Sequence, residues 1–377
     1  MIKKTFFALL FLLIVKFNYS QAPVYSNEFL SIGVDAKAIS LANTCIATVS
    51  DVSAGYWNPA GLVNLKRDFE IGLMHNEYFG GISSYNYGAI AIKIDSNSAI
   101  GFSYIRMSTD NIPNTLDLID NDNNINYDKV SSFSVADNAI FLSYARKSNK
   151  IQGLRYGASA KYIFRYVGDF GSSKGFGLDV GAQYNYKKWI FGLMCRDITS
   201  TFNAWTYNTE TFADAFTRTG NTIPKNSVEV TLPKIIIGAA REFKLPMNFN
   251  ALTEINVDFT TDGQRNVLIS SKVFNADPHL GIQIGYKDFV FIRGGLYNIQ
   301  KVKDDNNKSE WTFQPNFGIG FKIIDLISID YALSNFSGNK DQGNIVPLSN
   351  IFSLKVSLDK KILKSLNKYN RTGQIKS

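Results

Sequence analysis

The fold is decided by the stretch Leu154-Arg155-Tyr156-Gly157-Ala158-Ser159-Ala160-Lys161-Tyr162-Ile163-Phe164-Arg165, in which apolar side chains alternate with mostly polar or small ones. A period of two places the set from Leu154 to Phe164 on one face of a β-strand and the set from Arg155 to Arg165 on the other. Twelve alternating residues exceed the about five or six of a usual soluble strand and match the roughly 9 to 11 that cross a bilayer on a tilt. The stretch therefore predicts a membrane-spanning strand.

The same alternation recurs along the chain, for example at 176–186 and 311–323. We expect fourteen strands, near 69–77, 85–94, 98–107, 138–147, 153–166, 175–186, 188–197, 231–242, 248–258, 279–286, 288–297, 311–323, 325–334 and 348–358.

The connections between these strands alternate in length. Short ones are expected at 95–97, 148–152, 187, 243–247, 287 and 324, and long ones at 108–137, 198–230, 259–278, 298–310 and 335–347. Bacterial outer-membrane barrels have an even number of strands, short periplasmic turns and longer outer loops. The sequence thus predicts an all-β fold: an antiparallel transmembrane β-barrel of about 14 strands over 67–358, provided that the strand-like Val267–Phe274 belongs to a long outer connection.

The two ends of the chain carry the positive charge. Lys3 and Lys4 precede an apolar run from Thr5 to Val15, which predicts a secretory signal peptide over 1–20 that is removed before Gln21. Residues 359–377 form a basic tail, which we expect in the periplasm. Three of the 40 basic residues lie in 1–20 and six in the tail, with one of the 32 acidic residues, so the rest of this +8 chain is neutral. A nucleic-acid-binding groove is therefore not expected.

One alternative fold gives the same alternation. A secreted all-β sandwich or propeller also buries one face of each strand and exposes the other to water. The length of the strands, the unequal connections and the signal peptide favour an outer-membrane barrel, because only helices or closed sheets satisfy backbone groups in lipid.

Residues 21–66 do not alternate and contain few charges, with alanine at positions 36, 38, 42, 47, 54 and 60. An ordered segment of this length before a closed sheet has to bury its surface. The lumen of a barrel of this size is wide enough to accept it. We expect an N-terminal hatch that plugs the lumen.

This segment resembles a known family. The runs Asn27-Glu28-Phe29-Leu30-Ser31-Ile32-Gly33-Val34 and Asp51-Val52-Ser53-Ala54-Gly55-Tyr56-Trp57-Asn58-Pro59-Ala60-Gly61-Leu62 are similar to the hatch of the FadL superfamily of outer-membrane proteins, of which Asn-Pro-Ala is the signature. The longer form before Asn58 resembles the PorV-type branch of the type IX secretion (Por) system of Bacteroidota. The match covers the hatch, and the barrel resembles the family only in pattern.

The motif residues of the hatch are Asp51, Tyr56, Trp57, Asn58, Pro59, Ala60 and Gly61. Pro59 fixes its own φ, Asn58 is excluded from the helical region, and Gly61 permits a positive φ, which together predict a rigid turn. In the family context the turn would hold the hatch against the inner wall of the barrel.

Charged residues on the polar faces of the strands are expected to face the lumen, because charge on the lipid face is costly. They are Lys161, Asp179, Glu254, Asp258, Lys322 and Asp330. Structural pairing, with each other or with the hatch, is expected rather than substrate binding. Two cysteines and two histidines at these spacings form no zinc pattern, and no nucleophile or phosphate-binding motif occurs. We expect no enzyme, no metal and no cofactor.

The resemblance implies a component of type IX secretion that recognises or shuttles cargo with C-terminal sorting domains. Its partners would be secreted cargo proteins, other secretion components and outer-membrane lipid, with cargo contact through 108–137 and 198–230. The alternative is a FadL-like transporter of long-chain hydrophobic molecules. A plugged barrel suits both functions, so the sequence leaves them open.

Overall fold

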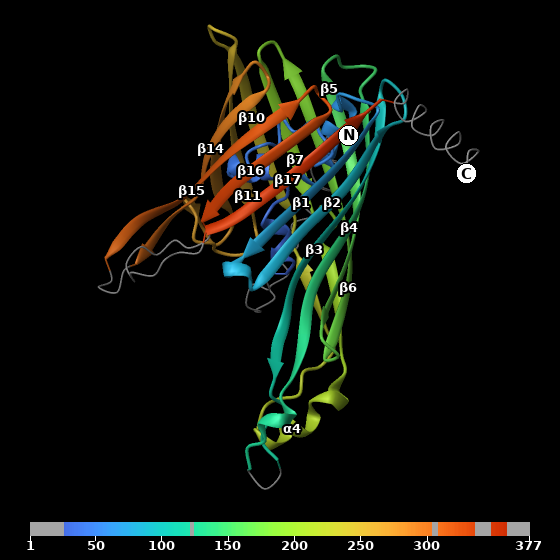
Figure 1. Cartoon of the computed structure of the whole chain (residues 1–377), viewed down its shortest axis with the longest axis vertical. Helices are drawn as coiled ribbons and strands as arrows, with labels where there is room; N and C mark the ends of the chain where they lie inside the picture. The colour runs from blue at the N-terminus through green and yellow to red at the C-terminus, as the bar shows by residue number, and fades with distance from the viewer. Residues whose placement is uncertain (1–25, 121–123, 304–307, 336–347, 360–377) are drawn as a thin grey trace, which may run out of the picture.

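The computed structural model describes residues 26–120, 124–303, 308–335 and 348–359 (Figure 1). The predicted signal peptide and the tail beyond residue 359 lie outside this part of the chain. The described residues form a closed antiparallel sheet, in which β1 (Phe69–Tyr78) pairs with both β2 (Ser83–Lys93) and the last strand, β17 (Leu348–Leu358).

The remaining strands follow one another around the wall. They are β3 (Ser98–Asn114), β4 (Ser131–Lys147), β5 (Leu154–Val167), β6 (Gly171–Tyr186), β7 (Trp189–Arg196), β8 (Thr201–Tyr207), β9 (Ser227–Thr231), β10 (Lys234–Lys244), β11 (Phe249–Thr260), β12 (Ile269–Ser270), β13 (Asn275–Tyr286), β14 (Val290–Lys303), β15 (Ser309–Ile323) and β16 (Ile327–Asn335).

Seventeen strands occupy fourteen positions in the wall. β7 and β8 both pair with β6 and form one spanning strand interrupted at 197–200, and β9 and β10 form the next, interrupted at Leu232 and Pro233. The two-residue β12 only borders β13. The predicted barrel is therefore confirmed, and the segment from Val267 to Phe274 does lie in a long connection.

The two ends of the barrel differ. The short-turn end carries the connections 94–97, 148–153, 187–188, 245–248, 287–289 and 324–326, and the long-loop end carries the others. The prediction was wrong in placing all of 108–137 and 198–230 in loops, because β3, β4, β8 and β9 continue into these ranges. The alternation weakens there, since strands beyond the membrane no longer need an apolar face.

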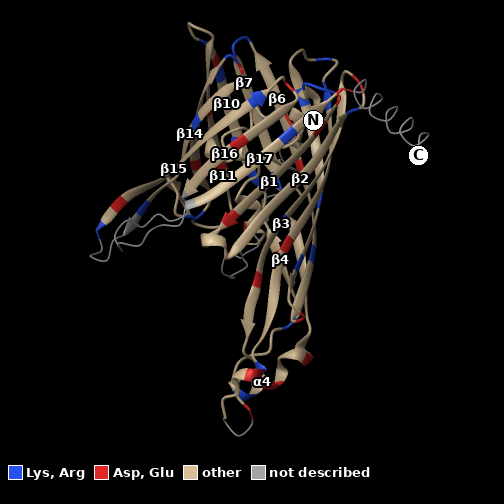
Figure 2. Cartoon of the chain, in the orientation of Figure 1, with Lys and Arg blue, Asp and Glu red and all other residues tan. Residues whose placement is uncertain are grey.

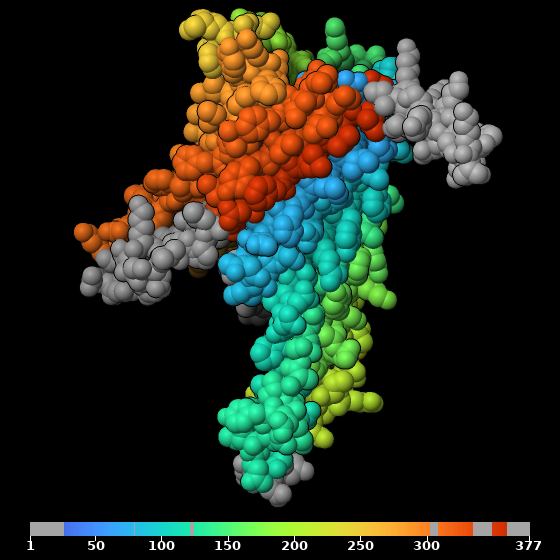
Figure 3. Space-filling view, viewed as in Figure 1, coloured from blue at the N-terminus to red at the C-terminus, as the bar shows by residue number. Residues whose placement is uncertain are grey.

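These extended strands build an arm, defined as residues 107–120, 124–137, 162–175 and 201–231. Its end carries η5 (Thr209–Thr211) and α4 (Ala213–Arg218). The arm projects far beyond the rest of the barrel as a narrow column (Figures 1 and 3). The wall is thus tall on one side and low over β16, β17, β1 and β2.

The faces of the strands are those that the alternation predicts. Tyr156, Tyr162 and Phe176 are exposed on the outward face, whereas Ser159, Lys161 and Asp179 are buried on the inward face. Long uncharged runs follow the strands in Figure 2. A closed sheet with an apolar outer surface suits a lipid environment, and the protein is an outer-membrane protein.

Residues 26–65, which we call the inner segment, lie inside the barrel. They contain η1 (Glu28–Ser31), α2 (Ala36–Ser40), α3 (Ala54–Trp57) and η2 (Pro59–Asn64). Most of these side chains are buried against inward-facing residues of the wall. Within the described ranges, no helix is long and apolar enough to span a membrane.

Candidate functional site: the lumen and the inner segment

The inner segment contacts the wall around most of its circumference. α2 packs on β14, β15, β16 and β17, and η2 packs mainly on β3, β4, β5 and β6. Between them, the Glu254 carboxylate of β11 accepts hydrogen bonds from the Ala47 amide at 2.7 Å and the Thr48 hydroxyl at 2.5 Å. The segment is therefore fixed at several separate places.

Asn58 is the centre of the contact with β6 and β7. Its side-chain nitrogen donates to the carbonyls of Ile46 at 2.9 Å, Ala182 at 3.1 Å and Leu193 at 3.4 Å. Its side-chain oxygen accepts from the Ala60 amide at 3.2 Å and so caps η2. The extended backbone of Asn58, with φ −158° and ψ 103°, is what Pro59 imposes on the preceding residue.

The expected role of Gly61 is corrected by the structure. Gly61 lies within η2 and has no positive φ; the motif starts a short helix rather than a turn. A Cβ atom at Gly61 would lie 2.2 Å from the Val49 carbonyl oxygen, so close backbone approach requires the glycine. Pro59 takes the first helical position, where its missing amide hydrogen costs nothing.

Tyr56 and Trp57 hold the two halves of the inner segment together. The Tyr56 hydroxyl donates to the Leu30 carbonyl, and the Trp57 indole donates to the Val34 carbonyl at 2.9 Å. The guanidinium of Arg196, from the end of β7, lies 4.4 Å from the centre of the Tyr56 ring. This cation–π contact joins the motif to the wall beside the interruption in β7–β8.

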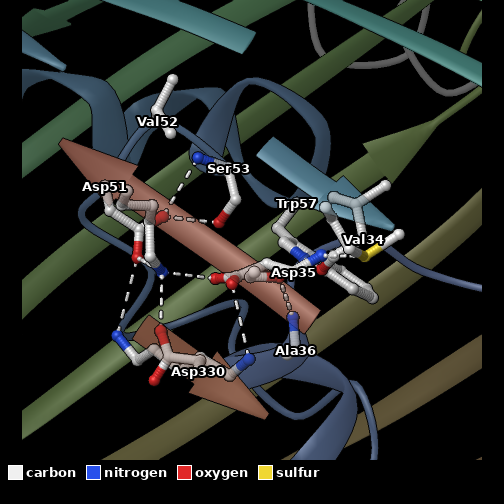
Figure 4. Close-up of polar contacts among 12 residues, drawn as sticks. Val34, Asp35, Ala36, Asp51, Val52, Ser53, Trp57 and Asp330 are labelled. Carbon is white, nitrogen blue, oxygen red and sulfur yellow. Dashed lines mark hydrogen bonds and ion pairs between the residues drawn. The ribbon is translucent and has the colours of Figure 1, made fainter. Parts of the chain in front are cut away.

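Asp51 belongs to a buried charge cluster at the short-turn side (Figure 4). Its carboxylate lies 3.0 Å from the Lys355 ammonium of β17 and 3.7 Å from that of Lys37, and it also accepts from Ser53. Burial opposes ionisation of Asp51, but Lys355 and Lys37 outweigh it and hold the pKa of this carboxyl below its usual range.

Lys161 and Asp179 form a second cluster, beside the interruption between β7 and β8. The Lys161 ammonium lies 2.8 Å from Asp179 and 2.6 Å from Asp197, whose carboxylate also accepts from the Thr201 hydroxyl. The Asp197 amide donates to Asp179 at 2.7 Å. This cluster satisfies the polar groups that the irregular backbone would otherwise leave unpaired.

The other predicted lumen charges are placed separately. Asp330 on β16 pairs with Arg293 at 2.7 Å and belongs to the cluster of Asp51, whereas Asp258 pairs with Lys234 at 2.5 Å. Lys322 differs from the rest, because it lies at the short-turn end and pairs with Asp325 of the adjoining turn.

Sequence reasoning missed several charged residues that pair with the predicted ones or lie beside them: Asp35, Lys37, Arg196, Asp197, Lys234, Arg293 and Lys355. The alternation could have identified Arg293 and Lys355, since both interrupt apolar strands on the polar face. Asp35 lies in no alternating stretch, and Asp197 ends the predicted strand 188–197 on the same face as its apolar residues, so the sequence gave no sign that either faces the lumen.

Two cavities lie on opposite sides of the inner segment. The first, of about 60 Å³, borders η1, Lys161, Arg196, Asp197 and Pro233. The second, of about 400 Å³, opens at the short-turn end and is lined by charges of both signs, among them Asp51 and Lys355. The inner segment thus separates two spaces in the lumen.

The outward face carries an apolar groove of about 500 Å³ across β2–β6. Its base is formed by the small side chains of Ala158 and Ala160, between larger ones such as Phe102 and Leu142. It reaches Leu178, whose carbonyl accepts from the Ile198 amide within the interruption of β7–β8. The edge of the groove at Leu178 and the small inner cavity at Asp179 and Asp197 therefore lie on the two faces of the wall beside the interruption.

No family model and no curated protein matches the chain. Solved structures do match in fold. A structure titled "CymD monoaromatic hydrocarbon channel" has a TM-score of 0.55 and 13% identity, over 87% of this chain and 98% of that one. The toluene transporter TodX of Pseudomonas putida gives 0.54 and 12%, over 87% and 99%. The toluene transporter TbuX of Ralstonia pickettii gives 0.52 and 12%, over 86% and 98%.

These neighbours are FadL-family outer-membrane barrels, so the fold of the chain is that of this family. Identity this low shows the fold alone. It does not distinguish the PorV-type branch from the others, and the predicted branch stays a prediction.

Proposed function

We propose that the protein is an outer-membrane channel for hydrophobic molecules, which leave or enter the lumen through the wall at the interruption of β7–β8 and β9–β10. The observation that carries the proposal is that an inner cavity and the edge of an apolar outer groove, at Leu178, lie on the two faces of the wall beside two interrupted neighbouring strands.

The inner segment supports this function, because it obstructs a straight aqueous path along the barrel axis. Its role would be that of a hatch. The neighbours in fold are named as channels and transporters of toluene or monoaromatic hydrocarbons, which agrees with an apolar cargo.

The test is to fill the outer groove without touching the lumen. Ala160→Trp places a bulky side chain in the groove, whereas Ala239→Trp makes the same change on the outward face of β10, away from it. Uptake of radiolabelled toluene and of a labelled long-chain fatty acid into proteoliposomes is measured for both variants. We expect Ala160→Trp to lower uptake of at least one probe fivefold or more and Ala239→Trp to leave it unchanged. Equal uptake would refute the route.

One observation favours the second function, a docking role in type IX secretion. The two long loops predicted to contact cargo meet at the end of the arm, where Arg218 donates to the carbonyls of Ile119 at 2.8 Å and Leu116 at 3.4 Å. A rigid column carrying joined loops suits recognition of a protein.

Gentle purification from native membranes distinguishes the two functions. Cargo with C-terminal sorting domains, recovered with the intact chain and lost with Arg218→Ala, would support docking. Recovery of bound hydrophobic molecules from both chains would support the channel.

A further inference from the structure

The strongest unused feature is the charge cluster that ties the inner segment to the short-turn side of the wall. The Lys355 ammonium lies 2.7 Å from the Asp35 carboxylate and 3.0 Å from that of Asp51, both in the inner segment, and 3.7 Å from Asp330 of β16. Figure 4 shows Asp35, Asp51 and Asp330 converging on one region. The Lys355 side chain is only 8% exposed.

The three carboxylates of this cluster do not have the same number of cationic partners. Asp330 has a second cation in Arg293 at 2.7 Å, and Asp51 has one in Lys37 at 3.7 Å. For Asp35, Lys355 is the single ion-pair partner within the described part of the chain. Loss of Lys355 would leave a buried carboxylate uncompensated beside two others, which is strongly unfavourable.

The backbone at Asp35 is strained. Its φ of 73° with ψ of 119° lies in a region that residues with a side chain seldom adopt. Gly33, two residues earlier, also has a positive φ, of +97°. The Asp35 amide donates to the thioether sulfur of Met74 at 3.0 Å, and a thioether is a weak acceptor. The contacts that hold this strained turn are the Lys355 ion pair, the Ser353 hydroxyl that accepts from the Ala36 amide, and the Trp57 indole that donates to the Val34 carbonyl.

The wall behind this part of the inner segment has small residues where the two approach most closely. Cβ atoms added at Gly295 and Gly318 would lie 2.3 Å from the Leu41 carbonyl carbon and 2.4 Å from the Ser40 Cβ atom. Ala332 and Ser353 continue the same surface. Withdrawal of α2 would uncover a trough along β14–β17 that these small residues and the polar side chain of Asn316 line, since Asn316 donates to the Ile39 carbonyl at 2.7 Å. The second cavity, of about 400 Å³, already reaches Asp330 and Lys355.

We infer that Lys355, Asp35 and Asp51 form an autoinhibitory latch, which holds α2 and the strained turn before it against β14–β17 and keeps the second cavity closed toward the outer half of the lumen. Release of the latch lets the turn relax and opens an aqueous path along the trough. The inference rests on the proposed function only in treating the lumen as a passage.

The test is the ion conductance of the purified full-length chain in planar bilayers containing KCl. Lys355→Met removes the latch, and we expect at least a tenfold rise in mean conductance over the unmodified protein. Lys355→Arg keeps the charge and should remain near the unmodified value. Heat-modifiable mobility on gels confirms that each variant retains a folded barrel.

Lys147→Met is the control, since Lys147 ends β4 at the short-turn end, borders neither inner cavity and donates from its ammonium to the Ser96 carbonyl at 2.8 Å. Its conductance should stay low.

Two substitutions at Asp35 test the role of backbone strain. Both remove the charge, but Asp35→Asn keeps a strained backbone that favours release, whereas glycine adopts the positive φ without strain. Asp35→Asn should therefore conduct more than Asp35→Gly. An unchanged conductance of Lys355→Met, or an equal rise in Lys147→Met, would overturn the latch. Equal conductance of Asp35→Gly and Asp35→Asn would overturn the role of strain. KCl conductance is independent of toluene uptake, so the latch and the hydrophobic channel can fail separately.

Discussion

Asn58 binds the inner segment to the wall through a side chain that is fully buried. Its side-chain nitrogen donates to carbonyls from three different parts of the chain. An oxygen atom in place of this nitrogen could not donate and would face only other acceptors. The chemistry of the amide, rather than its size, is therefore what the position requires.

Asn58→Asp tests this requirement. We expect the free energy of unfolding into denaturant to fall by about 1–3 kcal/mol for each buried carbonyl left unsatisfied, because aspartate has the same shape without the donors. Asn248→Asp, in an exposed short turn, should change it by less than about 0.5 kcal/mol. Similar values for the two variants would contradict the assignment.

Val180 tests which face of β6 meets lipid. The side chain is 41% exposed on the outward face, so Val180→Arg should destabilise the protein by about 2–4 kcal/mol when it lies near the bilayer midplane. Ser328→Arg is the control, because Ser328 borders the second cavity, where the charge can be hydrated. Reversible folding into lipid vesicles measures both, and equal penalties would show that the faces are assigned wrongly.

Gln183 is unsuitable as that control, although its place in the sequence predicts a tolerant lumen position. Its side chain donates to the carbonyls of Ile46 at 3.2 Å and Val49 at 3.0 Å, so a larger residue would strike the inner segment.

At the scale of elements, β5 and β6 provide a seat for η2. Gly157 and Gly181 are direct cross-strand partners. A Cβ atom at Gly157 would lie 2.8 Å from the Ala60 amide nitrogen, and one at Gly181 would lie 2.1 Å from the Asn58 side-chain oxygen. The two glycines let the Asn-Pro motif approach the wall, which neither strand could offer alone.

Gly181→Ala should therefore destabilise the docked inner segment by about 1–3 kcal/mol through overpacking. Gly88→Ala is the comparison, since the nearest atom to its added Cβ is a Leu73 methyl at 3.7 Å. Protease cleavage within residues 26–65 reports on release of the segment. Cleavage that is faster in Gly181→Ala than in Gly88→Ala is expected, and the reverse order would exclude the seat.

At the scale of the molecule, the closure of β1 on β17 fixes which end of the barrel each terminus meets. β17 ends at the short-turn end, where Arg67 pairs with Asp359. Ser26 and Asn27, in contrast, bond Glu229 and Thr231 near the base of the arm. The inner segment thus crosses the lumen from the long-loop end to the short-turn end.

This topology predicts the side on which the basic tail lies. An epitope tag after Ser377 should be unlabelled in intact cells and labelled once the outer membrane is permeabilised. The same tag inserted after Gly220, in the connection between α4 and β9, should be labelled in intact cells. Surface labelling at Ser377 would require an odd number of crossings and would refute the barrel topology.

The sequence by itself determined the number of spanning strands, their boundaries at the short-turn end to within about three residues, and the face that the alternating residues present. These features are local, because a period of two and a lipid-facing side are properties of each strand alone. It also located the Asn58–Gly61 motif, although it gave Gly61 the wrong conformational role.

Only the tertiary structure decided which charges meet, where the wall is interrupted and how the long loops build an arm. Lys355 and Asp35 are 320 positions apart and are joined by closure of the barrel around the inner segment. Asp197 follows β7 and meets Lys161 of β5, because the pairing of β5 with β6 and of β6 with β7 brings the two residues together. Such pairings depend on register, closure and threading together, and no local pattern of residues encodes them.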